Sequence, residues 1–275
     1  MREKLGVDEL KQMAQRVRLD VLSMLTKAGS GHPGGSLSVT DILVALFFNI
    51  MNIDTDSFKK SGTDRFHLSK GHACPALYAV LARLGFFPVE ELETIRQFGT
   101  RLQGHPHPKA PGIEVASGSL GQGLSVACGK AIVEKMNNSG AYSYVVLGDG
   151  ELQEGQIWEA AMFASHHKLD NLIVFVDNNG LQIDGKNDEV ISIKPLADKW
   201  VSFGFNTIEI NGHDIASIIK AVDEAKQVKG KPSVIIAKTV KGKGVSFMEH
   251  NVDFHGKTPT EAELTQAIED LKGAE

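Results

Sequence analysis

The sequence predicts an α/β fold in which a parallel β-sheet is flanked by helices on both faces. Short, continuously apolar segments such as YSYVVL (142–147) and LIVFVD (172–177) alternate with helical segments, a pattern typical of strands buried on both faces. Glycine, acidic residues and asparagine follow both segments, at the strand ends where parallel sheets bind ligands. With 275 residues, 42% of them apolar, the chain is long enough for one such domain, and we expect a single domain over residues 1–275.

The expected elements follow one another along the chain. Residues 8–27 place apolar side chains at helical spacing, and this first helix is expected to end at Gly29. A second helix is expected to start at Ser38, because residues 38–41 have the form of a capping box. Residues 66–69 predict a short strand that leads into a helix ending near Gly85. The later expected elements are helices at about 120–136, 156–167, 195–202, 214–227 and 258–272, and strands at 142–147, 172–177, 205–210 and 233–239.

Composition and charge exclude several classes of protein. The net charge of −5 and the pI near 6.1 provide no basic face, which argues against nucleic acid or an anionic membrane as partner. The first residues lack the apolar core of a secretory signal, and the longest uninterrupted apolar runs are too short to span a bilayer. Cys74 and Cys128 have no metal or redox spacing, so we expect buried thiols in a cytoplasmic protein.

The loop GDGELQEG (148–155) combines glycines, which favour phosphate binding, with acids, which repel phosphate. Asp149 ends one predicted strand and Asn179 follows another, and neighbouring parallel strands would bring the two side chains together. With the main-chain carbonyl of Leu181 they form an oxygen set that suits Mg²⁺ or Ca²⁺, which in turn accepts phosphate oxygens. The alternative is a tight acidic turn, since Gly-Asp-Gly is common in turns. The second strand end favours the metal site.

Four of the ten histidines lie beside glycine in predicted loops: His32, His72, His105 and His255. A single such histidine is usually structural, but four in similar loops indicate a binding site. Their spacing fits no compact zinc motif. Imidazoles of this kind donate hydrogen bonds or move protons at a polyhydroxylated substrate.

Two further loops leave alternatives open. GSLGQG (118–123) is either a glycine-rich helix start that allows close packing or a loop whose backbone contacts a ligand. It does not match the P-loop pattern GxxxxGK[ST], and it lacks the preceding strand of a dinucleotide fingerprint. The loop KTVKGKG (238–244) either covers the site or only exposes its lysines to solvent.

Taken in order, these motifs resemble those of the transketolase family. GDG followed by DNN (177–179) resembles the thiamine diphosphate signature, and SGHPGG, SKGH, GHP, GSLGQG and a late HG add a transketolase-like set. The resemblance runs over about residues 12–258. It is to the diphosphate-binding (PP) domain, and the chain resembles most closely the N-terminal subunit of a split transketolase.

The resemblance implies thiamine diphosphate and Mg²⁺ as cofactors, with Ca²⁺ or Mn²⁺ as substitutes. It places Asp149, Asn179 and the Leu181 carbonyl on the metal, and the backbone N–H of Gly150 on the diphosphate. Glu154 matches an acid in the carboxylate network that couples paired active sites across a dimer interface.

The resemblance also implies roles for the histidines in ketol transfer. His72 and His255 lie near the diphosphate, and His255 also faces the reacting centre. His32 and His105 approach the thiazolium and the sugar hydroxyls. The implied reaction moves a two-carbon glycolaldehyde unit from a ketose phosphate to an aldose phosphate.

Gly118 and Leu120 are implied to line the aminopyrimidine and the thiazolium. Ser119 departs from the pattern, because full-length members usually have proline there, and this puts the backbone of that loop in doubt. The family's pyrimidine-binding and C-terminal domains, which carry the activating glutamate and the basic residues for sugar phosphate, have no counterpart in the 275 residues. We therefore expect a separate partner subunit in an α₂β₂ assembly, with the chain inactive alone.

Two alternatives stay open. One is the PP subunit of another split thiamine diphosphate enzyme, either 1-deoxyxylulose 5-phosphate synthase-like or a transketolase for modified sugars. The other is a non-catalytic binding subunit, which would be expected to lose Asp149, Asn179 or several of the loop histidines, and all of these are present.

Overall fold

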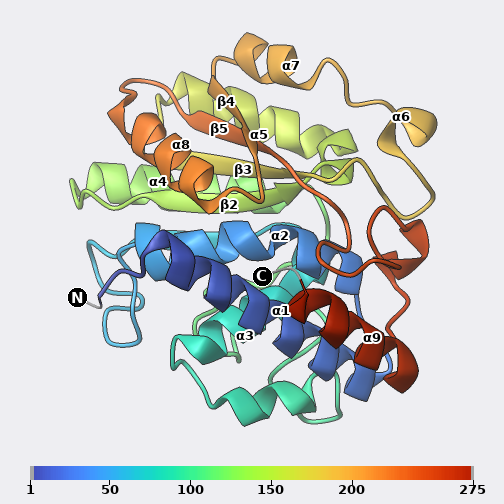
Figure 1. Ribbon diagram of the computed structural model, residues 1–275. Coiled ribbons are helices and arrows are strands. Elements are labelled where there is room, and N and C mark those ends of the chain that lie inside the picture. The colour runs from blue at the N-terminus through green and yellow to red at the C-terminus, as the bar shows by residue number, and fades with distance from the viewer. Residues whose placement is uncertain (1–2, 274–275) are drawn as a thin grey trace.

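The computed structural model describes residues 3–273, which form a parallel five-stranded sheet with the order β1-β2-β3-β5-β4. The strands are β1 (Arg65–Leu68), β2 (Ser143–Gly148), β3 (Leu172–Asn178), β4 (Asn206–Asn211) and β5 (Ser233–Lys238). The helices are α1 (Val7–Ala28), α2 (Pro33–Ala45), α3 (Cys74–Arg83), α4 (Gly123–Met136), α5 (Gly155–His166), α6 (Asn187–Val190), α7 (Leu196–Ser202), α8 (Ile215–Gln227) and α9 (Glu261–Lys272). The predicted fold class is confirmed, and Figure 1 shows helices on both faces of the sheet.

The strands β2, β3 and β5 are buried on both faces because their alternating side chains enter two different cores. In β2, Tyr144 and Val146 pack in the core shared with α1, α2, α3 and α8. Val145 and Leu147 pack on the other face, in the core shared with α4, α5 and α7. This two-sided burial explains why β2 and β3 are almost continuously apolar, whereas the partly exposed β4 contains polar residues.

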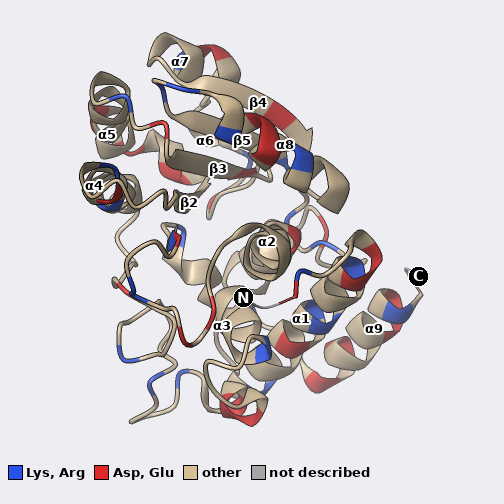
Figure 2. Ribbon diagram, turned by 90° about the vertical axis from the view of Figure 1, so that its left-hand side faces the viewer, with Lys and Arg blue, Asp and Glu red and all other residues tan. Residues whose placement is uncertain are grey.

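Helix α2 begins at Pro33, five residues before the predicted start at Ser38, and the predicted capping box at that point is wrong. Proline at the first turn is compatible with a helix start, since its missing N–H would have no helical partner there. Ser38 lies inside the helix and its Oγ donates to Asp177 Oδ2 at 2.6 Å. The segment Pro33–Ile50 is long and apolar enough to cross a membrane by composition, but it is 94% buried as a core helix. Figure 2 shows α2 nearly end-on and almost free of charged residues.

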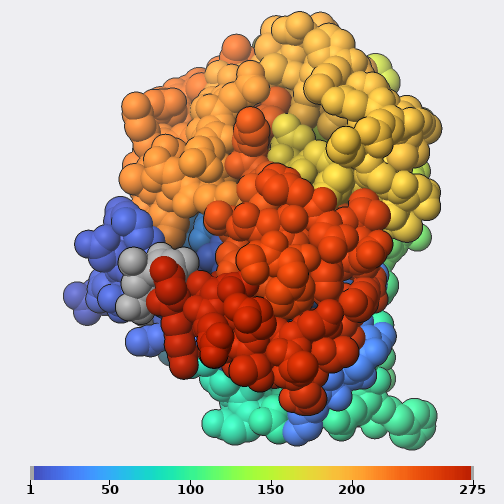
Figure 3. Space-filling model, turned by 45° about the vertical axis from the view of Figure 1, so that its right-hand side comes forward, coloured from blue at the N-terminus to red at the C-terminus, as the bar shows by residue number. Residues whose placement is uncertain are grey.

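The C-terminal segment after β5 returns to the N-terminal helices. Gly242 N–H donates to the Gly34 carbonyl at 3.0 Å, which fixes this segment at the start of α2. A short 3₁₀ turn, Val252–His255, follows, and α9 then packs against α1. Figure 3 shows this segment, in orange and red, lying across one face of the molecule.

The sheet register brings the two predicted metal-binding strand ends together. Gly148 of β2 pairs with Asp177 of β3, so the chain leaves both strands at the same edge. Asp149 and Asn179 follow directly. The two cysteines, Cys74 and Cys128, are free and buried, as predicted.

Candidate functional site

A cavity of about 360 Å³ lies at the carboxyl ends of the strands. Its lining includes all the site residues predicted from the sequence: His32, His72, His105, Gly118, Leu120, Asp149, Gly150, Glu154, Asn179, Leu181 and His255. They come from seven separate segments of the chain, so the sheet and its loops converge on one pocket. The position agrees with the general rule for ligand sites in parallel α/β sheets.

Asp149 is a buried carboxylate held by backbone donors. Its Oδ1 accepts from Gly150 N–H at 2.8 Å and its Oδ2 from Gly180 N–H at 2.5 Å. Burial raises the pKa of Asp149 to about 6, and the nearby Asp177 carboxylate adds to this shift. Gly150 N–H points at Asp149 in this structure, so its contact with a diphosphate stays a prediction.

Asn179 and Leu181 line the same cavity as this carboxylate and add an amide oxygen and a main-chain carbonyl to it. Asn179 Oδ1 accepts from Leu181 N–H at 3.1 Å, which closes a turn after β3. The Leu181 carbonyl already faces a positive charge, because Lys241 Nζ lies 3.4 Å away. A carboxylate, an amide oxygen and a main-chain carbonyl are ligands that Mg²⁺ and Ca²⁺ prefer. The donor chemistry of the pocket therefore fits the predicted cation.

A zinc site made of His, Cys, Asp or Glu side chains is not an alternative interpretation within the described residues 3–273. In that part of the chain, no group of three or more His, Cys, Asp or Glu side chains is arranged to hold a metal ion. A cation in this pocket would be bound by carboxylate, amide and main-chain oxygens of the protein, together with oxygens of a bound phosphate compound.

The four predicted histidines form one cluster. The ring centroid of His32 lies 5.4 Å from that of His72, 6.3 Å from that of His105 and 5.5 Å from that of His255. The rings of His72 and His255 are 5.1 Å apart. The four imidazoles are therefore neighbours in the lining of the pocket.

All four histidines are held neutral near pH 7. Burial lowers the pKa of His32 to about 4 with help from the Arg96 charge, and lowers that of His255 to about 3 with help from Lys241. Burial also lowers the pKa of His72 well below its usual value, and it lowers that of the more exposed His105. A neutral imidazole has one donor and one acceptor, which suits hydrogen bonding and proton exchange with hydroxyl groups.

Two neighbouring cations set which ring nitrogen carries the hydrogen. Lys241 Nζ lies 2.7 Å from His255 Nδ1, and Arg96 Nη2 lies 3.3 Å from His32 Nδ1. Because lysine and arginine cations can only donate, both Nδ1 atoms are acceptors. The hydrogen of each neutral ring is therefore on Nε2.

The glycines of SGHPGG let site side chains approach α2 closely. A Cβ at Gly34 would lie 2.9 Å from the Phe254 carbonyl and 3.0 Å from Lys241 Cγ. A Cβ at Gly35 would lie 3.2 Å from His72 Nε2. The motif is thus explained by packing of the site against the first turn of the helix.

Lys241 is the main site residue that the sequence did not single out. It lines the pocket and is 2% exposed, so this lysine of the loop 238–244 enters the site, whereas Lys238 is exposed to solvent. Burial lowers the pKa of Lys241 to about 8, and the charge of Lys70 contributes. A lysine in a glycine-rich loop gives no sequence signal that distinguishes burial from exposure.

A buried ion pair between Lys70 and Asp177 supports the floor of the pocket. Lys70 Nζ also donates to the Gly35 carbonyl at 3.1 Å, and Thr239 Oγ1 donates to Asp177. The pair thus ties β1, α2, β3 and the end of β5 together. Neither residue was assigned from the sequence, although both lie in quoted motifs.

Glu151, the acid for which the sequence suggested no function, is a structural anchor. Its Oε1 accepts from Ser69 Oγ and from Gly121 N–H at 2.9 Å, and its Oε2 accepts from Gly148 N–H at 3.0 Å. It therefore fixes the GSLGQG loop to the GDG loop. Glu154 is exposed beside this junction, and a Cβ at Gly121 would lie 2.8 Å from Glu154 Cβ.

Comparison with known proteins identifies the family to which the chain belongs. The model of the transketolase thiamine diphosphate binding domain matches residues 9–273. The chain belongs to the transketolase family. It is 44% identical over 265 residues to the 6-deoxy-6-sulfo-D-fructose transketolase subunit SqwG of Clostridium sp., covering 96% of both chains. It is 41% identical to a subunit of the apulose-4-phosphate transketolase of Phocaeicola vulgatus, covering 96% of this chain and 94% of that one.

The transketolase of Campylobacter jejuni has the same fold, with a TM-score of 0.90 at 34% identity. The match covers 98% of this chain but 43% of that one. The chain therefore spans less than half the length of this solved transketolase, and it has the length of the two relatives named as subunits.

Proposed function

We propose that the chain is the cofactor-binding half of a two-subunit transketolase that uses thiamine diphosphate and Mg²⁺. The observation that carries this proposal is the convergence of the oxygen set, the neutral histidine cluster and Lys241 on one cavity. Membership of a thiamine diphosphate-binding family supports the organic cofactor.

In this proposal the acidic loop binds a diphosphate through a cation. Asp149, the Asn179 amide oxygen and the Leu181 carbonyl hold Mg²⁺. Gly150 N–H, His72 and Lys241 face the diphosphate, whose charge compensates the buried ammonium of Lys241. Gly118 and Leu120 form the wall beside the rings of the cofactor, and Glu154 faces the partner subunit.

Bound thiamine diphosphate would supply a nucleophilic carbon and an electron sink for cleavage next to a ketone. The chain's own residues orient the sugar and move protons. In the overall reaction the bond between C2 and C3 of a ketose phosphate breaks, C3 becomes an aldehyde, and the two-carbon unit joins the aldehyde of an aldose phosphate. The Nε2–H groups of His32 and His255 would donate hydrogen bonds to the sugar oxygens, and His105 would exchange protons with the hydroxyls that lose or gain one.

The missing part of the active site is proposed to lie on a second chain. The relatives that have the length of this chain are named as transketolase subunits. A solved single-chain transketolase is more than twice as long. We infer a partner with the pyrimidine-binding and C-terminal domains, an activating glutamate and basic residues for sugar phosphate, assembled as α₂β₂ in the cytoplasm.

Co-purification with a candidate partner tests the proposal. Cleavage of xylulose 5-phosphate with an aldose phosphate acceptor is measured for the chain, for the partner and for their mixture, all with Mg²⁺ and thiamine diphosphate. The mixture is expected to be active and each chain alone inactive. An Asp149→Ala mixture serves as the inactive control. Full activity of the chain alone would contradict the half-site proposal.

A modified ketose is the second candidate substrate class. The observation that favours it is that the two subunit relatives described above are named for modified sugars, 6-deoxy-6-sulfo-D-fructose and apulose 4-phosphate. A donor panel with both sugars beside xylulose 5-phosphate distinguishes the classes. If kcat/KM for one modified sugar is at least tenfold higher than for xylulose 5-phosphate, that modified sugar is the physiological donor.

A further inference from the structure

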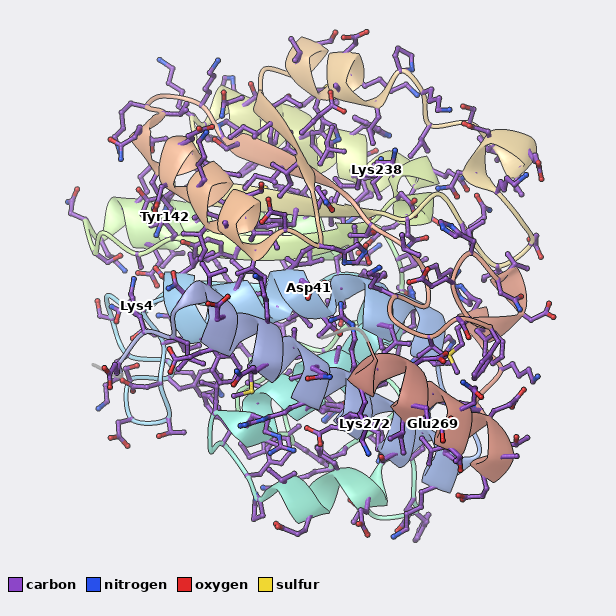
Figure 4. The ribbon with its side chains drawn as sticks, viewed as in Figure 1. Lys4, Asp41, Tyr142, Lys238, Glu269 and Lys272 are labelled. Carbon is purple, nitrogen blue, oxygen red and sulfur yellow. The ribbon has the colours of Figure 1, made fainter. Side chains whose placement is uncertain are left out.

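A chain of buried polar residues runs from α1 to the loop that carries Lys241. Arg18 Nη1 donates to Asp41 Oδ1 at 3.1 Å and Arg18 Nη2 to Asp41 Oδ2 at 2.5 Å. His213 Nδ1 lies 2.7 Å from Asp41 Oδ2, and Val240 N–H donates to His213 Nε2 at 2.8 Å. Figure 4 labels Asp41 on α2, between α1 and the sheet, and Lys238 at the end of β5, where this loop starts.

The hydrogen bonds define the state of the His213 ring. Its Nε2 accepts from a backbone N–H and so carries no hydrogen, which leaves the hydrogen on Nδ1, where it is donated to Asp41. The Arg18 fork fixes the orientation of the Asp41 carboxylate. Arg18 and Asp41 therefore act as supports that hold one imidazole with its acceptor facing Val240.

Val240 directly precedes Lys241, whose backbone is held by its neighbours. The Lys241 carbonyl accepts from His250 N–H at 3.0 Å, and Gly242 N–H donates to the Gly34 carbonyl at 3.0 Å. The contact from His213 to Val240 completes this clamp. The clamp aims Lys241 Nζ into the cofactor cavity, beside His255 Nδ1 and the Leu181 carbonyl.

We propose that His213 is a positioning residue for the cofactor site, which holds Val240 and thereby directs Lys241 at the diphosphate. The inference deepens the proposed function and rests on it for the ligand. His213 lies outside the cavity lining, so it acts through Lys241 rather than by contact with the cofactor. Its neighbour Asp214 provides a matched control, because Asp214 caps α8 by accepting from Ala216 N–H at 3.1 Å and Ser217 Oγ at 2.6 Å.

The first measurement is hydrogen–deuterium exchange of the Val240 amide in the full chain without cofactor. His213→Ala and His213→Asn remove the acceptor within reach of Val240, and exchange is expected to rise about five- to tenfold, as for the loss of one hydrogen bond. His213→Gln keeps an acceptor at about the reach of Nε2 and is expected to restore much of the protection. Asp214→Ala is expected to leave Val240 exchange unchanged. Equal exchange in wild type and His213→Ala would overturn the proposal.

The second measurement is a double-mutant cycle on the dissociation constant for thiamine diphosphate with Mg²⁺, in the complex with the partner subunit. His213→Ala is expected to weaken binding about fivefold and Lys241→Met at least tenfold, since a hydrogen bond to a charged group is lost. The double variant is expected to bind no more weakly than Lys241→Met, because His213 acts through that lysine. Multiplicative effects would overturn the proposal.

The two measurements separate the failure of this inference from the failure of the proposed function. If the wild-type complex binds no thiamine diphosphate, the proposed function is refuted, and Val240 exchange still decides whether His213 holds the loop. If the wild type binds and His213→Ala binds equally well, the proposed function stands and the positioning role is refuted.

Discussion

Replacing Asp149 with asparagine is expected to stabilise the metal-free chain at neutral pH while removing its response to metal and cofactor. In the folded chain the pKa of this buried carboxyl is raised from 3.8 to about 6, first by burial and then by Asp177. At about 1.4 kcal/mol per pKa unit, a difference of about two units means that ionisation of Asp149 lowers the free energy of unfolding by roughly 3 kcal/mol. Asparagine keeps one acceptor oxygen for Gly180 or Gly150 and loses the other, which costs about 1 kcal/mol. The net gain is therefore about 2 kcal/mol.

The sign of the pH dependence follows from the direction of the shift. A folded-state pKa above the unfolded value means that the protonated carboxyl favours the folded state below pH 3.8, and that this contribution is lost as the pH rises through 6. Wild type and Asp149→Asn should differ little at pH 4. The free energy of unfolding of the variant, relative to wild type, should rise between pH 4 and pH 6 and stay constant above that range.

Urea unfolding in EDTA at pH 4, 6 and 8 measures this difference. Addition of Mg²⁺ and thiamine diphosphate at 100 times the dissociation constant should stabilise the wild type by about 2.7 kcal/mol and the variant much less. The order of stability would then reverse. The reasoning is refuted if the variant is the less stable protein in EDTA at pH 8, or if both proteins gain equally from metal and cofactor.

Three further substitutions test other parts of the account. Lys241→Met should raise the free energy of unfolding of the metal-free chain by up to about 3 kcal/mol below pH 8, because burial lowers the pKa of this lysine to about 8. This increase in the free energy of unfolding should disappear between pH 8 and 10.5. A difference between variant and wild type that does not change with pH in urea titrations would contradict it. Glu151→Ala leaves its three buried donors without a partner and should lower the free energy of unfolding by roughly 3 kcal/mol or more, with Glu151→Gln clearly less harmful. Equal losses in thermal unfolding would argue against the anchor role. Gly242→Ala should destabilise the chain, because its φ is +81° and a Cβ would lie 2.3 Å from the Met248 carbonyl oxygen. The control, Gly129→Ala in α4, meets open space and should stabilise by about 1 kcal/mol in the same unfolding assay.

Much of the fold was predictable because burial leaves a direct mark on the sequence. The continuous apolar segments of β2 and β3 follow from cores on both faces, and the parallel register then brought Asp149 and Asn179 to one edge. The start of α2 was not predictable from local signals. Ser38 looks like a cap, but its hydroxyl is used by Asp177, which is 139 residues away in the chain.

Some residues of the candidate site were recognisable from the sequence and others were not. The glycine-flanked histidines were recognisable from the sequence, and Gly35 leaves room for His72 against the first turn of α2. The anchoring contacts of Glu151 and the roles proposed for Lys241 and His213 were not recognisable, since each depends on contacts between distant segments. His213 reaches Asp41 across 172 residues, and nothing in the local sequence around either residue records that pairing.

A calorimetric titration tests the central claim most directly. Thiamine diphosphate and thiamine are titrated separately into the chain with the proposed partner subunit, in Mg²⁺ and again in EDTA. If the acidic loop binds a diphosphate through a cation, thiamine diphosphate should bind tightly only with Mg²⁺, and thiamine should bind at least a hundredfold more weakly. Equal binding of the two compounds, or tight binding of thiamine diphosphate in EDTA, would contradict a metal-bridged diphosphate site.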